Sequence, residues 1–322
     1  MIKWMALECP QRGGGNVKII RPITITAAML TSTDVAETDY AAWAVGTVFT
    51  AGDKCIVVAT HKIYIALVDV TGGSSPEVDV LATTPKWAEV SATNRWKVFD
   101  AAVGSQTTQA TSMTYKITTG EQFDSIAFLN CDAASIQIVM TDPAAGEVYN
   151  ETVYLLSTLV AGANTVYDWH SYFFSSYFRI SDVVKLDIPP FLNAVLDITL
   201  TYAGGTVKCG GIVLGLQATI GETQYSPSIG IRDYSTKEAD TYGIYRIVER
   251  AFSKRLTCDA TVPAAAVDTV ESLLAYYRAK PLVWVASESY SSMIIYGYCS
   301  DFGIVISYPT FAMLSIEIEG LT

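Results

Sequence analysis

Residues 39–100 read DYAAWAVGTVFTAGDKCIVVATHKIYIALVDVTGGSSPEVDVLATTPKWAEVSATNRWKVFD, and no other stretch says as much about the fold. Tyr, Trp and Phe recur in it at short intervals, and Gly-Asp and Pro interrupt the runs of β-branched residues between them. Aromatic residues at such spacings predict a very small β-unit that is held together by rings. Exposed rings of this kind also form a flat platform for a sugar, so binding is considered before catalysis.

The composition around this stretch predicts a protein that assembles. The chain has 322 residues, of which 50% are hydrophobic and 16% are charged, a length sufficient for two or three domains. No apolar run reaches the roughly 20 residues of a membrane span, because Asp197 or glycines interrupt the most apolar segments. The N-terminus lacks the apolar core of a signal peptide, since Glu8, Cys9 and Pro10 follow the first residues almost at once. We expect a chain so poor in charge to bury much of its surface as an obligate homo-oligomer.

The charge distribution disfavours nucleic acid as a partner. The formal net charge is −11, from 21 basic and 32 acidic residues. The densest basic stretch is Lys254-Arg255, with Arg246 and Arg250 nearby, whereas a phosphate backbone requires a contiguous basic stripe.

The cysteines do not predict a metal site or another cofactor. They form no C-x-x-C pair, and only His61 and His170 could supplement them as ligands. Each lies in an apolar or strand-like context, which predicts buried free thiols in a protein made in a reducing cytoplasm. The six residues are Cys9, Cys55, Cys131, Cys209, Cys258 and Cys299.

Strand signals dominate the rest of the chain. Short alternating runs rich in Val, Ile, Thr and Tyr occur at residues 113–118, 135–140, 195–202 and 312–319. Further strands are expected over residues 19–25 and 242–259. In the last run, Met313, Ser315, Glu317 and Glu319 share one face of a strand, and Leu314, Ile316 and Ile318 share the other. This alternation predicts a half-buried antiparallel strand.

One segment has helical periodicity, and we predict a helix over about 263–279. Pro263 suits a first turn, and Pro281 ends the helix. Arg278 and Lys280 lie near the C-terminal end, where they complement the helix dipole. The apolar positions at helical spacing are Val267, Val270, Leu273, Leu274 and Tyr277.

The sequence is thus mainly β, and its composition suggests four segments. Residues 1–30 form a lead-in with one strand, and residues 31–97 form the aromatic module. Residues 98–221 are expected to form a jelly-roll-like β-sandwich. Residues 222–322 are expected to form a β domain that contains the helix.

The order of motifs in the aromatic module resembles the small chitin- and cellulose-binding modules of type 5/12. The matching motifs are Trp43, Phe49-x-x-Gly52-Asp53, Tyr64-x-Ala66 and Trp87, with Phe49 in place of the usual Tyr and Cys55 in place of the usual Val. Trp43, Tyr64 and Trp87 are the candidate carbohydrate-binding residues, because flat rings stack on pyranoses. The alternative is that the three rings form the core of the module. Asp53 after Gly52 suits a turn, or else a hydrogen bond to a sugar hydroxyl.

A larger resemblance extends over most of the chain. The module ends in Asn94-Arg95-Trp96-Lys97-Val98-Phe99-Asp100, and this ending is similar to a family of tailed-bacteriophage virion proteins that are often labelled carbohydrate-binding or tail proteins. Residues 168–173, 242–243, 250–255 and 316–322 share the resemblance. It implies a structural component of the virion. The middle domain resembles galactose-binding-like folds, and the C-terminal pattern resembles domains of distal-tail or baseplate proteins that build rings around a tail tube.

No catalytic motif is present. The sequence has no G-x-S-x-G, no H-E-x-x-H, no dinucleotide fingerprint and no P-loop. His170 lies among aromatic residues, which indicates a buried or interface imidazole rather than a base. A glycosidase is the enzyme class left open, because it needs only two carboxylates about 5–9 Å apart. Asp182 with Asp187, or Glu317 with Glu319, could be named as such a pair.

We therefore expect a non-enzymatic virion protein of a tailed phage, made in the cytoplasm of the bacterial host, from the tail tip, the baseplate or an appendage adaptor. Its partners would be further copies of itself, in a ring or trimer, and other phage tail proteins. The aromatic module would bind host-surface glycan for host attachment. The alternatives are a purely structural adaptor without glycan binding and, less favoured, a glycosidase that degrades polysaccharide.

Overall fold

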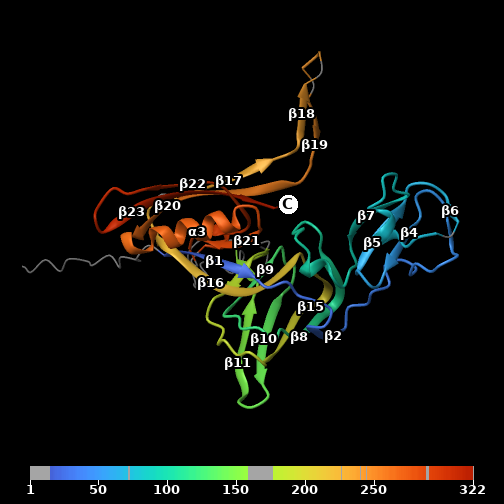
Figure 1. The fold of residues 1–322 in the computed structure, drawn as a ribbon, viewed down its shortest axis with the longest axis horizontal. Helices are drawn as coiled ribbons and strands as arrows, with labels where there is room; N and C mark the ends of the chain where they lie inside the picture. Colours follow the sequence, from blue (N-terminus) through green and yellow to red (C-terminus); the bar gives the residue numbers. More distant parts are fainter. Residues whose placement is uncertain are drawn as a thin grey trace, which may run out of the picture. The chain divides into compact units, whose positions relative to one another are not determined.

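The computed structural model describes residues 15–71, 73–158, 177–225, 227–239, 241–243, 245–287 and 290–321 (Figure 1). It is mainly β, as the sequence predicts. The chain forms two compact units. One, here the N-terminal unit, contains Pro22–Leu216. The other, here the C-terminal unit, contains Gln217–Leu321 together with the N-terminal residues up to Arg21.

The aromatic module is a small β-unit within the N-terminal unit. Strands β4 (Lys54–Val57), β5 (Lys62–Ala66) and β7 (Trp87–Ala92) form an antiparallel sheet in the order β4-β5-β7. Strands β3 (Val48–Phe49) and β6 (Val70–Thr71) pair beside it, and α1 (Pro76–Asp79) is a single turn. The buried core consists of Phe49, Cys55, Val57, Tyr64, Ala66, Val70 and Trp87.

The rest of the N-terminal unit is a β-sandwich. One sheet has the order β11-β10-β15-β8-β2, and β9 lies between β14 and the first residues of β16 in the other. Apolar side chains of both sheets meet in one core, among them Tyr115, Phe128, Ile138 and Leu214. The bounds are β2 (Leu30–Thr33), β8 (Thr107–Thr118), β9 (Ser125–Leu129), β10 (Ser135–Asp142), β11 (Gly146–Tyr154), β14 (Val183–Lys185), β15 (Val195–Cys209) and β16 (Gly211–Thr223).

Two short elements complete this unit. Strands β12 (Leu156–Thr158) and β13 (Tyr177–Arg179) pair with each other. The 3-10 turn η1 (Lys97–Phe99) follows the module and precedes the sandwich.

In the C-terminal unit, one face of a sheet is covered by a helix. The strand order is β1-β21-β22-β23-β20-β17, and the end of β16 also pairs with β20. Helix α3 (Val267–Tyr277) follows the 3-10 turn η2 (Ala264–Ala266) and buries Val270 and Leu274, so it is shorter than predicted. Pro263, predicted for the first turn of the helix, is instead the last residue of β20. The other bounds are β1 (Asn16–Pro22), β17 (Ser228–Asp233), β20 (Phe252–Pro263), β21 (Leu282–Val285), η3 (Ser291–Met293), β22 (Ile294–Val305) and β23 (Phe311–Gly320).

The alternation predicted for the last strand is confirmed. Leu314, Ile316 and Ile318 of β23 are buried, while Ser315 is exposed and Glu317 and Glu319 are half-buried. One face of β23 therefore belongs to the core and the other is open.

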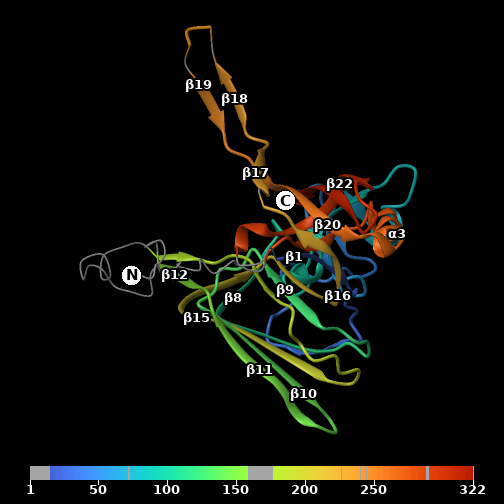
Figure 2. The same ribbon diagram turned by 90° about the vertical axis from the view of Figure 1, so that its left-hand side faces the viewer.

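A long hairpin projects from the C-terminal unit. Beyond β17 and β20, which pair from Ser228 to Thr257, the same two chain segments continue as β18 (Thr236–Ala239) and β19 (Tyr245–Val248). Figure 2 shows β18 and β19 extending away from the sheet of this unit. The sequence predicted one strand over residues 242–259, whereas the structure divides it into β19 and β20. We call the described residues between 228 and 252 the arm.

The N-terminal strand illustrates a long-range pairing that the sequence did not predict. Ile19 of β1 pairs with Trp284 of β21, so the lead-in segment contributes to the C-terminal sheet. No helix in the described ranges is long and apolar enough to span a bilayer.

Candidate functional site

Two of the three candidate carbohydrate-binding residues lie in the core of the module. Tyr64 is 3% exposed and Trp87 is 1% exposed. The ring of Trp87 contacts that of Phe49 edge-on, with centroids 5.0 Å apart. Trp43 is half-buried and packs against the same core. A module this small needs its largest side chains inside, so Tyr64 and Trp87 are not presented to a ligand in this conformation.

The opposite face of the same small sheet carries a hollow instead. Neighbouring residues of a strand point to opposite faces, so the chain neighbours of the core residues Cys55 and Tyr64 point away from the core. Lys54 and Ile63 are such neighbours, and both line a hollow of about 280 Å³. We call it the module hollow; its residues are Asp39, Tyr40, Lys54, Ile63, Val90, Ser91 and Lys97.

A β-bulge brings β7 to the module hollow. Ile63 pairs with Ser91 and Tyr64 pairs with Glu89, which leaves Val90 as an extra residue in β7. In a regular strand, residues four apart such as Trp87 and Ser91 point to the same face. The bulge changes this alternation, so Ser91 lies on the face opposite Trp87. The bulge could not be read from the sequence.

The module hollow combines an apolar floor, a ring and charged groups. Ile63 is buried and Val90 is 46% exposed. Tyr40 is also exposed, and the Nζ of Lys54 lies 5.5 Å from its ring centroid. Oδ2 of Asp39 accepts a hydrogen bond from the backbone N–H of Asn94, at 3.1 Å. Small-molecule sites have this mixture of apolar surface and a few placed polar groups.

Asp53 has a structural role in the turn before β4. Its Oδ2 accepts hydrogen bonds from the backbone N–H of Thr50 at 2.7 Å and from the Thr50 hydroxyl at 2.8 Å. The hydrogen bond from the backbone N–H, and to a smaller extent that from the hydroxyl, hold the pKa of Asp53 below its usual value. Gly52 has a φ of 97°, which favours glycine. The turn reading of Gly52-Asp53 therefore fits the geometry.

The segment that ends the module ties it to the sandwich. Oδ1 of Asn94 accepts from the N–H of Thr108, and its Nδ2 donates to the carbonyl of Thr108, both at 2.9 Å. The Tyr115 hydroxyl donates to the carbonyl of Arg95 at 2.9 Å. Asn94 thus pairs with β8 through its side chain, as a neighbouring strand would through its backbone.

A buried carboxylate organises the module side of this junction. Oε1 of Glu37 contacts Nδ1 of His61 and accepts from the Thr93 hydroxyl, both at 2.9 Å. The ring of His61 stacks on Trp96, with centroids 4.4 Å apart. Trp96 contacts Phe99, and Phe99 contacts Tyr115 of β8. His61 is thereby engaged in structural contacts. His170 and Cys9 lie outside the described residues.

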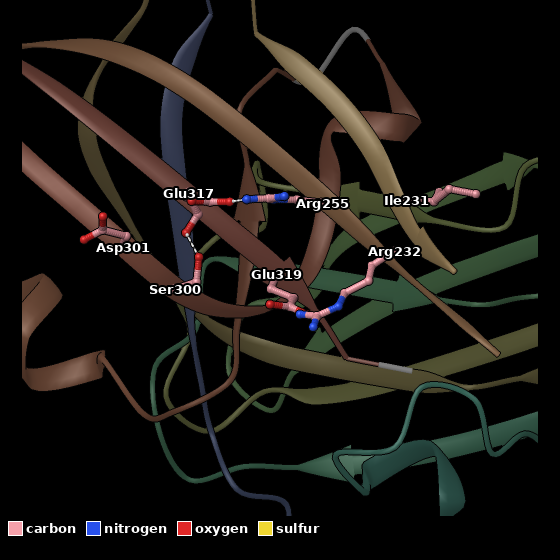
Figure 3. Close-up of a pocket in the computed structure, with 7 residues that line it drawn as sticks. All are labelled: Ile231, Arg232, Arg255, Ser300, Asp301, Glu317 and Glu319. Atoms are coloured by element: carbon pink, nitrogen blue, oxygen red, sulfur yellow. Dashed lines mark hydrogen bonds and ion pairs between the residues drawn. The ribbon is translucent and has the colours of Figure 1, made fainter. Parts of the chain in front are cut away.

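A second, charged hollow lies on the open face of the C-terminal sheet (Figure 3). Its volume is about 500 Å³, and its lining residues belong to β17, β20, β22 and β23. Arg232 pairs with Glu319 at 2.8 Å, and Arg255 pairs with Glu317. The Ser300 hydroxyl donates to the backbone carbonyl of Glu317 at 3.2 Å. We call it the arm-base hollow; its residues are Ile231, Arg232, Arg255, Ser300, Asp301, Glu317 and Glu319.

The electrostatics of the arm-base hollow do not suit a glycosidase acid. Burial alone would raise the pKa of Glu319, but the Arg232 guanidinium and hydrogen bonds from Tyr234 and Tyr298 hold it below its usual value. A general acid needs the opposite shift. Each carboxylate is also occupied by its own arginine.

The other carboxylate pair is also engaged in separate contacts. Oδ1 of Asp182 accepts from the N–H of Asn130 at 2.9 Å. Oδ1 of Asp187 accepts from the Tyr149 hydroxyl at 3.3 Å.

The described cysteines are buried free thiols. Cys55, Cys131, Cys209, Cys258 and Cys299 are all buried and unpaired by disulfides. Sγ of Cys131 lies 3.4 Å from Sγ of Cys209. Burial raises the pKa of Cys55, Cys258 and Cys299 to about 11. In the part of the chain that the structure describes, no three His, Cys, Asp or Glu residues are grouped as a metal site would require.

Comparison with known proteins adds no assignment. No family model matches the chain, and no curated protein matches it in a sequence search. The chemistry of the two hollows and of the arm therefore rests on their own geometry.

Proposed function

We propose that the chain is a non-enzymatic structural component of a tailed-phage virion, which assembles with further copies of itself and carries the aromatic module as a binding appendage. The place in the virion would be the tail tip, the baseplate or an adaptor for an appendage. The fold of the C-terminal unit suits a building block, because one sheet face is open and a hairpin projects from its edge.

The observation that carries the proposal is the exposed apolar surface of the arm. All described residues of β17 and β19 are exposed, including Ile231 at 66% and Ile247 at 65%. Among its described residues, the other large apolar side chains exposed on the arm are Ile229, Tyr234, Tyr242, Tyr245, Val248 and Phe252.

Such a surface favours assembly for two reasons. Contiguous exposed apolar patches are uncommon on monomeric proteins and mark interaction sites. Strand β17 is also the last strand of its sheet, so its outer backbone groups can pair with another chain. The low charge content of the sequence, 16%, agrees with a surface that other chains cover.

Location in the virion is tested directly with an antibody against the purified chain. Immunogold electron microscopy of phage particles from the host should label one end of the tail. Particles that contain the tail proteins but lack this chain would overturn the proposal.

A second candidate function, binding of host-surface glycan, is favoured by the module hollow. Its ring, apolar floor and polar groups lie together on the face opposite the module core. The competing use of the module is docking of another tail protein. A glycan array with the purified assembly separates the two uses, because an adaptor would bind no glycan. Host polysaccharide that is shortened after incubation with the protein would instead support the glycosidase alternative.

A further inference from the structure

We propose that the module hollow binds a pyranose that bears an anionic substituent, within a host-surface polysaccharide. This inference rests on the glycan-binding part of the proposed function and specifies its ligand class. It also moves the site away from Tyr64 and Trp87 to the opposite face of the same sheet.

The charge of the module hollow is the first support. Lys54 and Lys97 contribute two ammonium groups and Asp39 one carboxylate, which leaves an excess of one positive charge. Neither lysine forms an ion pair with any described residue; Lys54 lies near the ring of Tyr40, and Lys97 acts on Asp100 only at longer range. In a chain with a net charge of −11, a locally positive hollow is selective for an anionic group.

The apolar part of the module hollow suits a sugar ring rather than a bare anion. The exposed ring of Tyr40 and the side chain of Val90 provide surface for the C–H face of a pyranose. Ser91 offers a hydroxyl beside them. The volume of about 280 Å³ lies just below the range of about 300–1,000 Å³ typical of pockets for drug-sized ligands. One sugar unit is therefore the expected occupant.

Asp39 gives the module hollow a fixed acceptor for sugar hydroxyls. Its Oδ2 is held by the N–H of Asn94, and no other described residue hydrogen-bonds to the carboxylate. Oδ1 therefore keeps its capacity to accept from a ligand. Both Oδ1 and Nδ2 of Asn94 hydrogen-bond to the backbone of Thr108. The Asp39 carboxylate is therefore fixed through Asn94 to the junction between the module and the sandwich.

The test compares acidic and neutral sugars on the full-length protein by isothermal titration calorimetry. The probes are oligogalacturonate for a carboxylate, a phosphorylated mannan oligosaccharide for a phosphate, and cello- and chito-oligosaccharides as neutral sugars. The variants are Lys54→Gln and Lys97→Gln. Lys86→Gln is the matched control, because Lys86 is an exposed lysine of the same module that does not line the hollow. Thermal melting verifies that each variant is folded.

We expect at least one acidic probe to bind more tightly than the neutral sugars, and the preferred probe identifies the anionic group. Lys54→Gln and Lys97→Gln should each weaken its binding about tenfold, since each removes a charge-assisted hydrogen bond. Lys86→Gln should leave it unchanged.

Three results would overturn the inference. Neutral sugars that bind as tightly as the acidic ones would retain a glycan-binding module but remove its acidic specificity. An equal loss in Lys86→Gln would reduce the binding to unspecific attraction. No binding of any probe would remove glycan binding altogether, while assembly and virion location, which are measured separately, would stand.

Discussion

At the scale of single residues, the rings of the module separate into core and surface. Trp87 is surrounded by the module core, so we expect Trp87→Ala to lower the free energy of unfolding of the module by about 3–5 kcal/mol. Thermal melting with limited proteolysis of the module measures this loss. Leu81→Ala is the control, because Leu81 is 87% exposed on the same module. If Trp87→Ala kept full stability and lost only sugar binding, the ring would be a binding platform after all.

Asn94 is the residue that connects the module to β8. Asn94→Ala removes two hydrogen bonds to the backbone of Thr108, and we expect a loss of about 1–2 kcal/mol in the free energy of unfolding. Asn94→Asp keeps the acceptor for the Thr108 N–H and loses only the donor. Asn94→Asp therefore retains the hydrogen bond from the Thr108 N–H, but its second carboxylate oxygen repels the Thr108 carbonyl. Urea denaturation measures the loss of stability in both variants. A stability unchanged in Asn94→Ala would mean that the junction does not depend on this amide.

The candidate site shows what residue types can and cannot predict. The rings were identified as the informative residues, but their types fit both a core and a platform, and burial decided between these only for Tyr64 and Trp87. Lys54 and Ile63 alternate with core residues along their strands, a signal present in the sequence. Ser91 and Val90 could not be placed, because the bulge in β7 depends on pairing with β5.

At the scale of elements, the spacing of apolar residues predicted those strands and helices that depend on residues near one another in the chain. The alternation in β23 and the helical periodicity of α3 are confirmed, but the helix spans 267–277 instead of about 263–279. Residues 264–266 form a 3-10 turn, and the helix ends before Arg278. Pairing across the chain was not predicted. Nothing in residues 16–22 indicates that their partner is β21, since strand partners depend on the whole core. The division of residues 242–259 into β19 and β20 was also missed.

The stabilisation by the ion pair between Arg232 of β17 and Glu319 of β23 should depend on pH. Glu319 has a folded-state pKa below its usual value, so the stabilisation from its pairing with Arg232 is fully present above the unfolded pKa of about 4.3 and is lost as the pH falls through the folded pKa. Glu319→Gln should therefore lower the melting temperature at pH 7, and the difference from wild type should shrink towards pH 3. Calorimetric melts across this range measure it.

Asp301→Asn is the control for Glu319→Gln, because Asp301 lines the same arm-base hollow without an ion pair among the described residues. A difference between Glu319→Gln and wild type that stayed constant with pH would contradict the ion-pair account.

At the scale of the whole molecule, assembly and binding are complementary. A hollow that holds one sugar unit binds weakly, whereas several modules on one assembly bind a repetitive polysaccharide with much greater strength. The arm is thus the feature on which the proposed function most depends. Its exposed apolar residues would be covered by neighbouring copies, as expected of an obligate oligomer.

The most direct test is the mass of the purified full-length protein in solution, measured by light scattering after size-exclusion chromatography. We predict a single species at a multiple of 34.9 kDa. The double variant Ile231→Asp with Ile247→Asp should dissociate, because it places charges in the covered surface of the arm. Leu81→Asp, an equal change at an exposed position of the module, should not. A stable wild-type monomer would contradict the account.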